Sequence, residues 1–133
     1  MAAAIRKDST VAKKRVFVSF DFDNDKALKD FIIGQAQLPD SPFEVNSLKE
    51  AQPQRDWETK ARAAISRSDV LIVMLGSRTR SASGVLKEVK LAQELEKTRF
   101  QVIGYRNGSA HWAVPGAGRT YRWNWDNLKK LLA

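Results

Sequence analysis

The feature that most constrains the fold of this chain is a run of six consecutive apolar residues, Val70–Leu75. The run lies between Asp69 and Gly76 and is far shorter than the roughly 20 apolar residues that a membrane-spanning helix needs. Short apolar runs between turn-forming residues are typical of strands that are buried on both faces, as in the centre of a parallel sheet. The run therefore predicts a sheet that other elements cover on both sides.

Strands and helices alternate along the rest of the chain. Residues 15–20 and 100–105 are rich in β-branched and aromatic side chains and predict two more strands, and residues 43–46 predict a short one. Apolar residues recur at helical spacing between these strands. The expected helices run from a cap at Asp23 or Asn24 to the end signals Gly34 and Pro39-Asp40, from Pro53 past Ile65, from about Gly84 to Lys97, and from Trp123 to Leu132.

Four strands that alternate with four helices predict an α/β fold, with a parallel sheet and helices on both faces, as one domain over residues 14–133. In such folds a ligand binds beyond the carboxyl ends of the strands, near the point where the strand order reverses. Four segments should meet at that edge of the sheet, namely 19–24, 47–56, 75–84 and 105–120. We expect the functional site among them.

Composition narrows the chemistry of that site. The chain has 133 residues and no cysteine, and its single histidine is His111. Thiol chemistry, disulfides and Cys- or His-rich metal sites are therefore excluded, and no metal or cofactor is expected. The net charge of +8 favours anionic partners such as nucleotides, nucleic acid or acidic lipid.

The charge excess is concentrated near the start of the chain. Residues 1–15 hold five basic side chains against Asp8 alone. We interpret residues 1–13 as a basic, flexible N-terminal tail. The absence of a membrane-spanning stretch or a secretory signal in the sequence predicts a cytoplasmic protein without a membrane partner.

One carboxylate lies on the apolar side of the expected helix 84–97. At about 100° per residue, Glu88 falls inside the apolar arc that faces the sheet. Burial makes an unpaired carboxylate costly and raises its pKa. Glu88 is thus either paired with a basic residue, placed at the edge of the apolar stripe, or a catalytic or ligand-binding group. The arc consists of Val85, Val89, Leu91, Ala92 and Leu95.

The loop before this helix, residues 76–84, favours the ligand-binding interpretation. It leads into a helix N-terminus, whose free backbone N–H groups favour anions, and Arg78 and Arg80 can assist. The Gly-Lys-Ser/Thr ending of a P-loop is missing. The loop therefore predicts an anion site of another type.

The acidic cluster Asp21–Asp25, directly after the first strand, allows several interpretations. It is similar to the nucleophile loop of haloacid-dehalogenase-like phosphatases, but Asp25 stands where that loop has Thr or Val. It begins like an EF-hand loop, but Lys26 replaces the required glycine and Ile32 the required glutamate. Helix capping and a favourable interaction with the helix dipole are the simplest role.

Two further groups have a structural and a functional interpretation. His111 lies in an expected loop, where plain exposure competes with a general acid–base role. Trp123 and Trp125 either anchor the last helix by packing or form a platform on which nucleic-acid bases stack.

Several motifs, in their order and spacing, give the chain a family resemblance. Residues 14–25 resemble the opening strand and loop of the TIR-like proteins of bacterial Thoeris antiphage defence, which are distant relatives of Toll/interleukin-1 receptor domains. Residues 75–79, Leu-Gly-Ser-Arg-Thr, are similar to that family's Gly-Ser-x-Thr loop. Residues 83–89 stand at its Trp-Val-x-x-Glu-Ile helix start, with Gly84 where many members carry Trp. The resemblance covers roughly residues 14–131.

This resemblance implies a flavodoxin-like (TIR-like) fold and an NAD glycohydrolase or ADP-ribosyl cyclase. Such an enzyme cleaves the nicotinamide–ribose bond of NAD, which is its substrate and not a cofactor. In the defence family the product is a cyclic ADP-ribose isomer that activates an effector protein, and self-association is expected. By resemblance Glu88 is the catalytic glutamate; Phe20, Asp21, Ser77, Arg78 and Ser83 are candidates for NAD binding, with loop 105–120 as a cover.

Two other functions remain open at this point. In a non-catalytic TIR-like or receiver-like interaction module, Glu88 would be structural and the surface would recruit partners. A nucleic-acid-binding domain would use the basic surface, and its binding would depend steeply on salt. The sequence carries no single-strand-binding or helix-turn-helix pattern, so a nucleic-acid partner is the less favoured alternative.

Overall fold

A computed structural model of the chain describes residues 13–46 and 54–132. The predicted tail, apart from Lys13, lies outside the described residues. So do residues 47–53, which include Pro53 and most of one predicted site segment.

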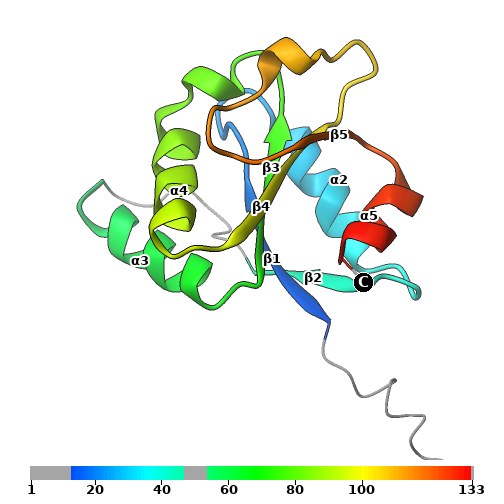
Figure 1. Cartoon of the computed structure of the whole chain (residues 1–133), viewed down its shortest axis with the longest axis horizontal. Helices are drawn as coiled ribbons and strands as arrows, with labels where there is room; N and C mark the ends of the chain where they lie inside the picture. The colour runs from blue at the N-terminus through cyan, green and yellow to red at the C-terminus, as the bar shows by residue number, and fades with distance from the viewer. Residues whose placement is uncertain (1–12, 47–53, 133) are drawn as a thin grey trace, which may run out of the picture.

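Five parallel strands form one sheet in the order β2-β1-β3-β4-β5 (Figure 1). This is the strand order of flavodoxin-like folds, in which the order reverses between the first and the third strand. The predicted α/β class and flavodoxin-like arrangement are thereby confirmed. The strands are β1 (Lys14–Ser19), β2 (Phe43–Val45), β3 (Val70–Leu75), β4 (Thr98–Ile103) and β5 (Thr120–Arg122).

Helices cover both faces of the sheet, as predicted. Helices α2 (Lys26–Ala36) and α5 (Trp125–Leu132) lie on one face, and α3 (Gln54–Ser66) and α4 (Ser83–Glu94) lie on the other (Figure 1). The helix that follows β1 and the helix that follows β3 therefore leave the sheet toward opposite faces. Two 3₁₀ helices, η1 (Thr79–Ser81) and η2 (Ala110–Trp112), lie in the loops after β3 and β4.

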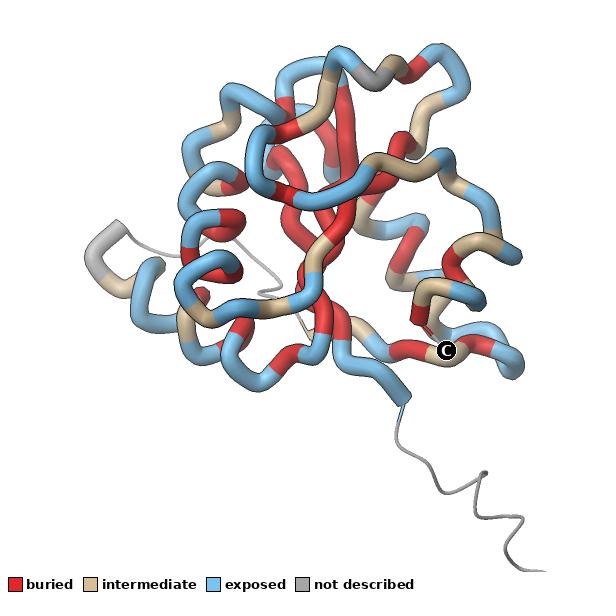
Figure 2. Tube along the Cα trace, in the orientation of Figure 1, coloured by how far each residue is buried: buried red, intermediate tan, exposed pale blue. Residues whose placement is uncertain are grey.

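The central strand β3 is buried over its whole length, as its apolar run predicts (Figure 2). Its alternate side chains enter two separate cores, because successive residues of a strand point to opposite faces. Leu71 and Val73 pack on the α3 and α4 side, whereas Ile72 and Met74 pack on the α2 and α5 side. Each such side chain contributes roughly 1.5–3 kcal/mol through burial.

One strand was absent from the sequence-based prediction. Strand β5 has only three residues, none of them fully buried, and pairs in parallel with Gln101–Ile103. Three residues are too few to show an alternation of apolar and polar side chains, so the sequence pattern does not reveal this strand. The strand forms because tertiary structure brings it beside β4. The predicted strand over 100–105 begins two residues earlier, at Thr98, and the last helix begins at Trp125 and not at Trp123.

Helix α2 also departs from its prediction. Its N-cap is Asp25, without a side-chain capping hydrogen bond, in place of Asp23 or Asn24, and it ends at Ala36, between the predicted end signals Gly34 and Pro39-Asp40. Its sequence predicts an apolar stripe of Ala27, Leu28, Phe31 and Ile32, of which only Leu28 and Ile32 are buried. Phe31 is 58% exposed, and its ring stacks on Trp123 at 5.4 Å between centroids.

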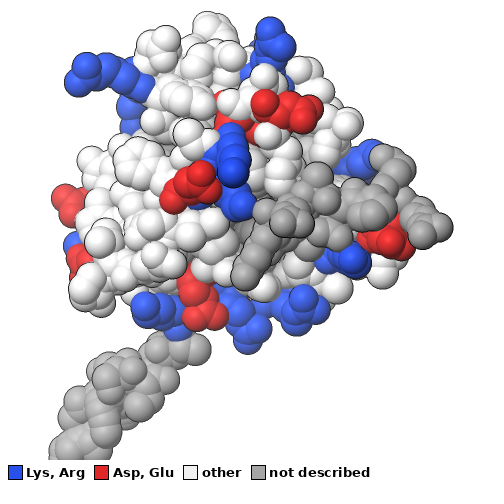
Figure 3. All heavy atoms as spheres, turned by 180° about the vertical axis from the view of Figure 1, so that it is seen from behind, with Lys and Arg blue, Asp and Glu red and all other residues white. Residues whose placement is uncertain are grey.

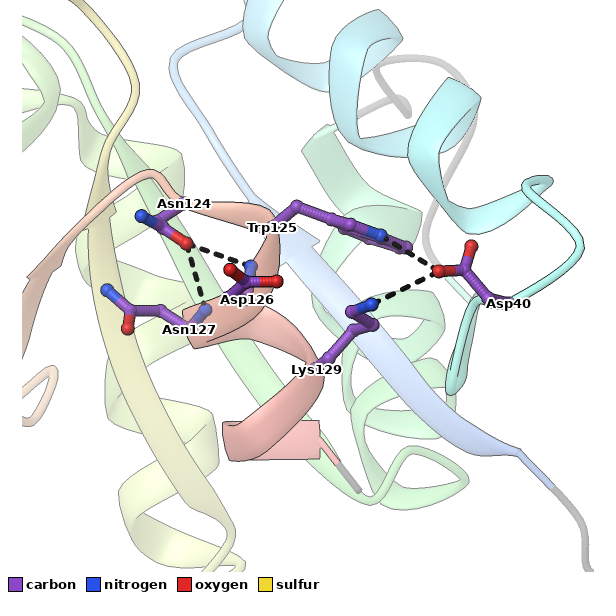
Figure 4. A network of polar contacts seen from close by, with 6 residues as sticks. All are labelled: Asp40, Asn124, Trp125, Asp126, Asn127 and Lys129. Atoms are coloured by element: carbon purple, nitrogen blue, oxygen red, sulfur yellow. Dashed lines mark hydrogen bonds and ion pairs between the residues drawn. The ribbon is translucent and has the colours of Figure 1, made fainter.

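Helix α5 is attached to the rest of the protein by a polar network (Figure 4). The Asn124 side chain caps it by accepting hydrogen bonds from the N–H groups of Asp126 and Asn127. Asp40 accepts hydrogen bonds from the Lys129 ammonium and the Trp125 indole, and these donors lower the pKa of its carboxyl. The interpretation of Trp125 as a packing anchor is consistent with its ring contact to Phe43.

Replacing Gly34 with alanine is expected to stabilise the protein by about 0.5–1 kcal/mol, because glycine inside a helix carries an entropic cost. A Cβ at this position would meet no atom within 4 Å. Urea unfolding of the parent and the Gly34→Ala variant measures the difference. A lower free energy of unfolding in the variant would contradict the helical continuation through residue 34.

Candidate functional site

A cavity of about 320 Å³ lies at the carboxyl edge of the sheet, between the loop after β1 and the start of α4. It therefore occupies the switch point between β1 and β3, where ligands bind in folds of this type. Its volume falls in the roughly 300–1,000 Å³ range of small-molecule sites. We call it the first cavity; it is lined by Phe20, Asp21, Phe22, Asp23, Asn24, Arg78, Ser81, Ala82, Ser83, Gly84 and Val85.

The loop after β1 forms one wall of the first cavity. The rings of Phe20 and Phe22 contact each other, with centroids 4.4 Å apart. The buried Asp21 carboxylate accepts hydrogen bonds from the backbone N–H of Asp23, at 3.1 Å, and from the Asn24 amide, at 2.7 Å. The acidic cluster therefore folds its own loop and supplies no capping side chain to α2.

The N-terminus of α4 forms the opposite wall. Its N-cap residue, Ala82, makes no side-chain capping hydrogen bond. The N–H groups of the first turn are therefore available to an anion in the cavity. Arg78 and Ser83 line the same space, as the predicted anion site requires. Arg80 does not join them, because its guanidinium donates a hydrogen bond to the His111 carbonyl.

Glu88 faces the sheet, as the helical periodicity predicts. Its side chain is 4% exposed, and the Ser19 hydroxyl donates a hydrogen bond of 2.6 Å to its Oε1. None of the ion pairs among the described residues includes Glu88, so the basic partner considered as an alternative is not seen there. Burial raises the pKa of Glu88 to about 8, although the Ser19 hydrogen bond acts in the opposite direction. At pH 7 the carboxyl is therefore mostly protonated.

Glu88 is adjacent to the first cavity but does not line it. It lies one helical turn after Gly84, which does line the cavity, and its partner Ser19 directly precedes Phe20. A Cβ on Gly84 would meet open space, so the cavity is unobstructed on that side. The carboxyl is therefore buried next to residues of the cavity wall and does not itself line the cavity.

A second cavity, of about 440 Å³, adjoins the first. The two cavities share Asn24 and Arg78 in their walls. Ser77, a predicted NAD-binding residue, lines this second cavity and not the first. The second cavity is lined by Asn24, Asp25, Ser77, Arg78, Tyr105, Asn107 and Trp112.

Asp25 connects the loops that follow three strands. Its Oδ1 accepts a hydrogen bond of 2.8 Å from the Tyr105 hydroxyl, and its Oδ2 accepts one of 3.3 Å from the Thr79 hydroxyl. Thr79 in turn accepts a 2.7 Å hydrogen bond from the N–H of Gly76. Burial and the neighbouring Asp25 raise the pKa of Tyr105 to about 12. Asp25, Thr79 and Tyr105 therefore hold the edge of the sheet together.

Sequence reasoning missed this network, although signals for it were present. Asp25, Thr79 and Tyr105 each come within a few residues of the end of a predicted parallel strand. Gly76 carries a further signal, because a Cβ there would lie 2.1 Å from the Asp25 carboxylate. The glycine of the Gly-Ser-x-Thr motif is thus explained by the close approach of a side chain from another loop.

The predicted cover, residues 105–120, is partly fixed to the sheet. The buried Gln101 amide donates to the carbonyls of Val114 and Gly118 and accepts from the Val114 N–H. Arg99 donates to the carbonyl of Gly116 at 2.6 Å. Tyr105, Asn107 and Trp112, from the first part of the segment, line the second cavity. His111 is exposed, in agreement with its simpler interpretation.

Charge on the face seen in Figure 3 is mixed. Lys and Arg side chains lie interspersed with Asp and Glu among the described atoms, without a continuous basic stripe on that face. Within the described ranges, no group of three or more His, Asp or Glu residues is arranged to hold a metal ion. None of the described helices is long and apolar enough to cross a membrane.

Comparisons with known proteins address the fold. No protein-family model matches the sequence, and no curated protein sequence is significantly similar to it. The structure is similar to the crystal structure of a conserved protein from Enterococcus faecalis V583, with a TM-score of 0.65 and 11% sequence identity. The match covers 90% of this chain and 96% of that chain. The chain has a flavodoxin-like α/β fold. At this identity the likeness extends no further than the fold.

Replacing Gly76 with alanine is expected to destabilise the protein by about 1–3 kcal/mol, because the new methyl group displaces the Asp25 carboxylate from Thr79 and Tyr105. Urea unfolding measures the loss, and Gly34→Ala serves as the matched control at an open position. Equal effects of the two substitutions would contradict the network.

The buried carboxyl of Glu88 is expected to make folding stability depend on pH. Its pKa is about 8 in the folded chain against 4.5 for an unperturbed glutamate, so the unfolded chain loses this proton first as pH rises. Stability should therefore fall by roughly 3 kcal/mol between pH 4.5 and pH 7 from this group, and continue to fall until pH 8.

Unfolding of the parent and the Glu88→Gln variant across this pH range measures the effect. Glutamine keeps an acceptor for Ser19 but has no proton to lose, so the fall in stability should be absent from the variant. The same pH dependence in both proteins would show that Glu88 ionises normally.

Proposed function

We propose that this chain is a TIR-like enzyme that cleaves the nicotinamide–ribose bond of NAD. The observation that carries the proposal is the position of Glu88, a buried carboxyl without a cationic partner among the described residues, next to a nucleotide-sized cavity at the switch point. A desolvated carboxyl that burial keeps protonated costs stability. Such a cost is typical of a functional group.

The walls of the first cavity match the parts of this substrate. The exposed ring of Phe22, which contacts the buried Phe20, offers an apolar surface for the nicotinamide ring. Arg78 and the first turn of α4 offer positive charge and N–H donors for the pyrophosphate. Ser83 lies at the same helix end and can add a hydroxyl donor.

Cleavage breaks the bond between the ribose C1′ and the nicotinamide nitrogen, and the bonding electrons leave with nicotinamide. The leaving group is neutral, so no acid is needed to protonate it. Positive charge develops on the ribose, as in other glycoside cleavages. An ionised Glu88 stabilises that charge, most strongly in a site that excludes water.

Glu88 must change state to act in this way. Its side chain turns from Ser19 toward the cavity and loses its proton, and the positive nicotinamide ring of the bound substrate favours that ionisation. Water attack at C1′ then gives ADP-ribose, nicotinamide and a proton. Attack by an internal hydroxyl or ring nitrogen gives a cyclic ADP-ribose isomer instead.

The biological role is part of the same proposal and is supported by the resemblance of residues 14–131 to Thoeris proteins. In that role the nucleotide product is a signal that activates an effector protein in antiviral defence. Self-association of the chain accompanies catalysis.

A second candidate is a non-catalytic interaction module with the same fold. The position of Glu88 outside the cavity lining favours it, because a carboxyl fixed by Ser19 between α4 and β1 can be purely structural. The two candidates differ in what happens to NAD.

Purified protein, over a range of concentrations, is expected to release nicotinamide from NAD, detected by chromatography. Glu88→Gln should lower kcat/KM by about 100-fold or more, because it removes the charge that stabilises the transition state. Glu94→Gln is the matched control, since Glu94 lies exposed on the same helix and pairs with Arg62. Its activity should equal that of the parent.

The pH profile gives a second readout. Because burial raises the pKa of Glu88 to about 8, kcat/KM should rise about tenfold per pH unit below 8 and level off above it. Activity of Glu88→Gln equal to that of the parent would remove Glu88 from the mechanism. Absence of nicotinamide release at every pH and concentration would favour the interaction module.

A further inference from the structure

The second cavity has chemistry that NAD cleavage at Glu88 does not use. It is lined by residues of the loops after β1, β3 and β4, and it shares Arg78 and Asn24 with the first cavity. Its walls combine two aromatic side chains, Tyr105 and Trp112, with the amide of Asn107 and the carboxylate of Asp25. This combination matches the groups of a nucleoside.

The two cavities repeat one arrangement of side chains. Each has an aromatic pair, formed by Phe20 and Phe22 in the first and by Tyr105 and Trp112 in the second. Each also has one buried aspartate, Asp21 or Asp25. The shared wall holds a single cationic side chain, that of Arg78. A ligand with two similar halves joined by an anionic bridge fits this pattern.

Asp25 is only 4% exposed, but it lines the second cavity and does not use all of its hydrogen-bonding capacity. A carboxylate offers about four lone-pair sites. Asp25 uses one oxygen for Tyr105 and the other for Thr79, one hydrogen bond each. The remaining capacity suits the two hydroxyl groups of a ribose, a contact that carboxylates make in many nucleotide sites. The negative charge of a carboxylate also repels phosphate, so the phosphates of the ligand should lie nearer Arg78.

Trp112 is held in place within the wall. Its ring meets that of Tyr105 edge-on, with centroids 6.2 Å apart and planes at 77°. It also packs against the core formed by β3, α3 and α4, and Gly108 leaves room for it, since a Cβ there would lie 3.1 Å from the indole. A fixed aromatic face binds a nucleobase by stacking with little loss of side-chain entropy.

We propose that the second cavity binds the second nucleoside of a dinucleotide, which is adenosine when the ligand is NAD. The base lies on Trp112 with its edge toward Asn107, the ribose hydroxyls bind Asp25, and the pyrophosphate lies at Arg78 between the cavities. The proposal rests on the proposed function for the identity of the ligand. It assigns specificity for the adenosine half to Trp112 and Asn107.

Isothermal titration calorimetry with the full chain tests the assignment. The probes are adenosine 5′-monophosphate for the second cavity, nicotinamide mononucleotide for the first, and ADP-ribose for both. Trp112→Ala should weaken binding of adenosine 5′-monophosphate and of ADP-ribose at least about tenfold. Binding of nicotinamide mononucleotide should change less than about twofold, because this probe does not reach Trp112.

Two further variants separate a binding role from a structural one. Asn107 is exposed, so Asn107→Ala leaves the fold intact. Among the two mononucleotide probes it should weaken binding of adenosine 5′-monophosphate alone, by about threefold or more. Trp57→Ala is the control for loss of a half-buried tryptophan, since Trp57 packs between α3 and α4 under Lys87. It should leave the affinity for all three probes unchanged.

Kinetics with NAD distinguish failure of this inference from failure of the proposed function. If the parent cleaves NAD, Trp112→Ala should raise KM about tenfold and leave kcat within about twofold. The subsite would be overturned, and the function upheld, if Trp112→Ala and Asn107→Ala cleaved NAD with the KM of the parent and bound adenosine 5′-monophosphate with the affinity of the parent. Trp112-dependent binding without nicotinamide release would uphold the subsite and overturn the function. A parent that does not bind adenosine 5′-monophosphate would overturn the subsite.

Discussion

The hydrogen bond between the Ser19 hydroxyl and the Glu88 carboxyl is the interaction on which the account of this protein depends. It joins the last residue of β1 to the second turn of α4, across the point where the strand order reverses. The bond places a titratable group in an apolar environment without a cation among the described residues, where burial holds its pKa near 8. The same contact joins the end of β1 to α4, whose first turn forms one wall of the first cavity.

A second set of contacts gives the edge of the sheet its shape. Asp25, Thr79 and Tyr105 come from the loops after β1, β3 and β4, and their hydrogen bonds hold these loops at fixed separations. Gly76 permits the approach because it has no Cβ. Both cavities include Arg78 of the loop after β3 in their walls. The proposed site for a two-part ligand therefore depends on the backbone of these loops as well as on the residues that line it.

The sequence is informative where a pattern is local and limited where it depends on distant partners. The apolar run of β3 and the inward direction of Glu88 follow from periodicity, and both are confirmed. Strand β5 exists because it pairs with β4, and the exposed position of Phe31 is stabilised by stacking on Trp123. Both depend on partners distant in the sequence, so the local sequence pattern predicts neither. The predicted cap of α2 was wrong because the Asp21 carboxylate organises its own loop. The enzymatic role of Glu88 stays a prediction.

The most direct test of the central claim is the ionisation of Glu88 itself. Carbon-13 NMR of the side-chain carboxyl carbons, with the Glu88→Gln variant to assign the resonance, follows the titration of this one group. The account predicts a midpoint near pH 8, well separated from the other glutamates. A midpoint near 4.5, the value of an unperturbed glutamate, would show that Glu88 is neither desolvated nor poised beside the cavity.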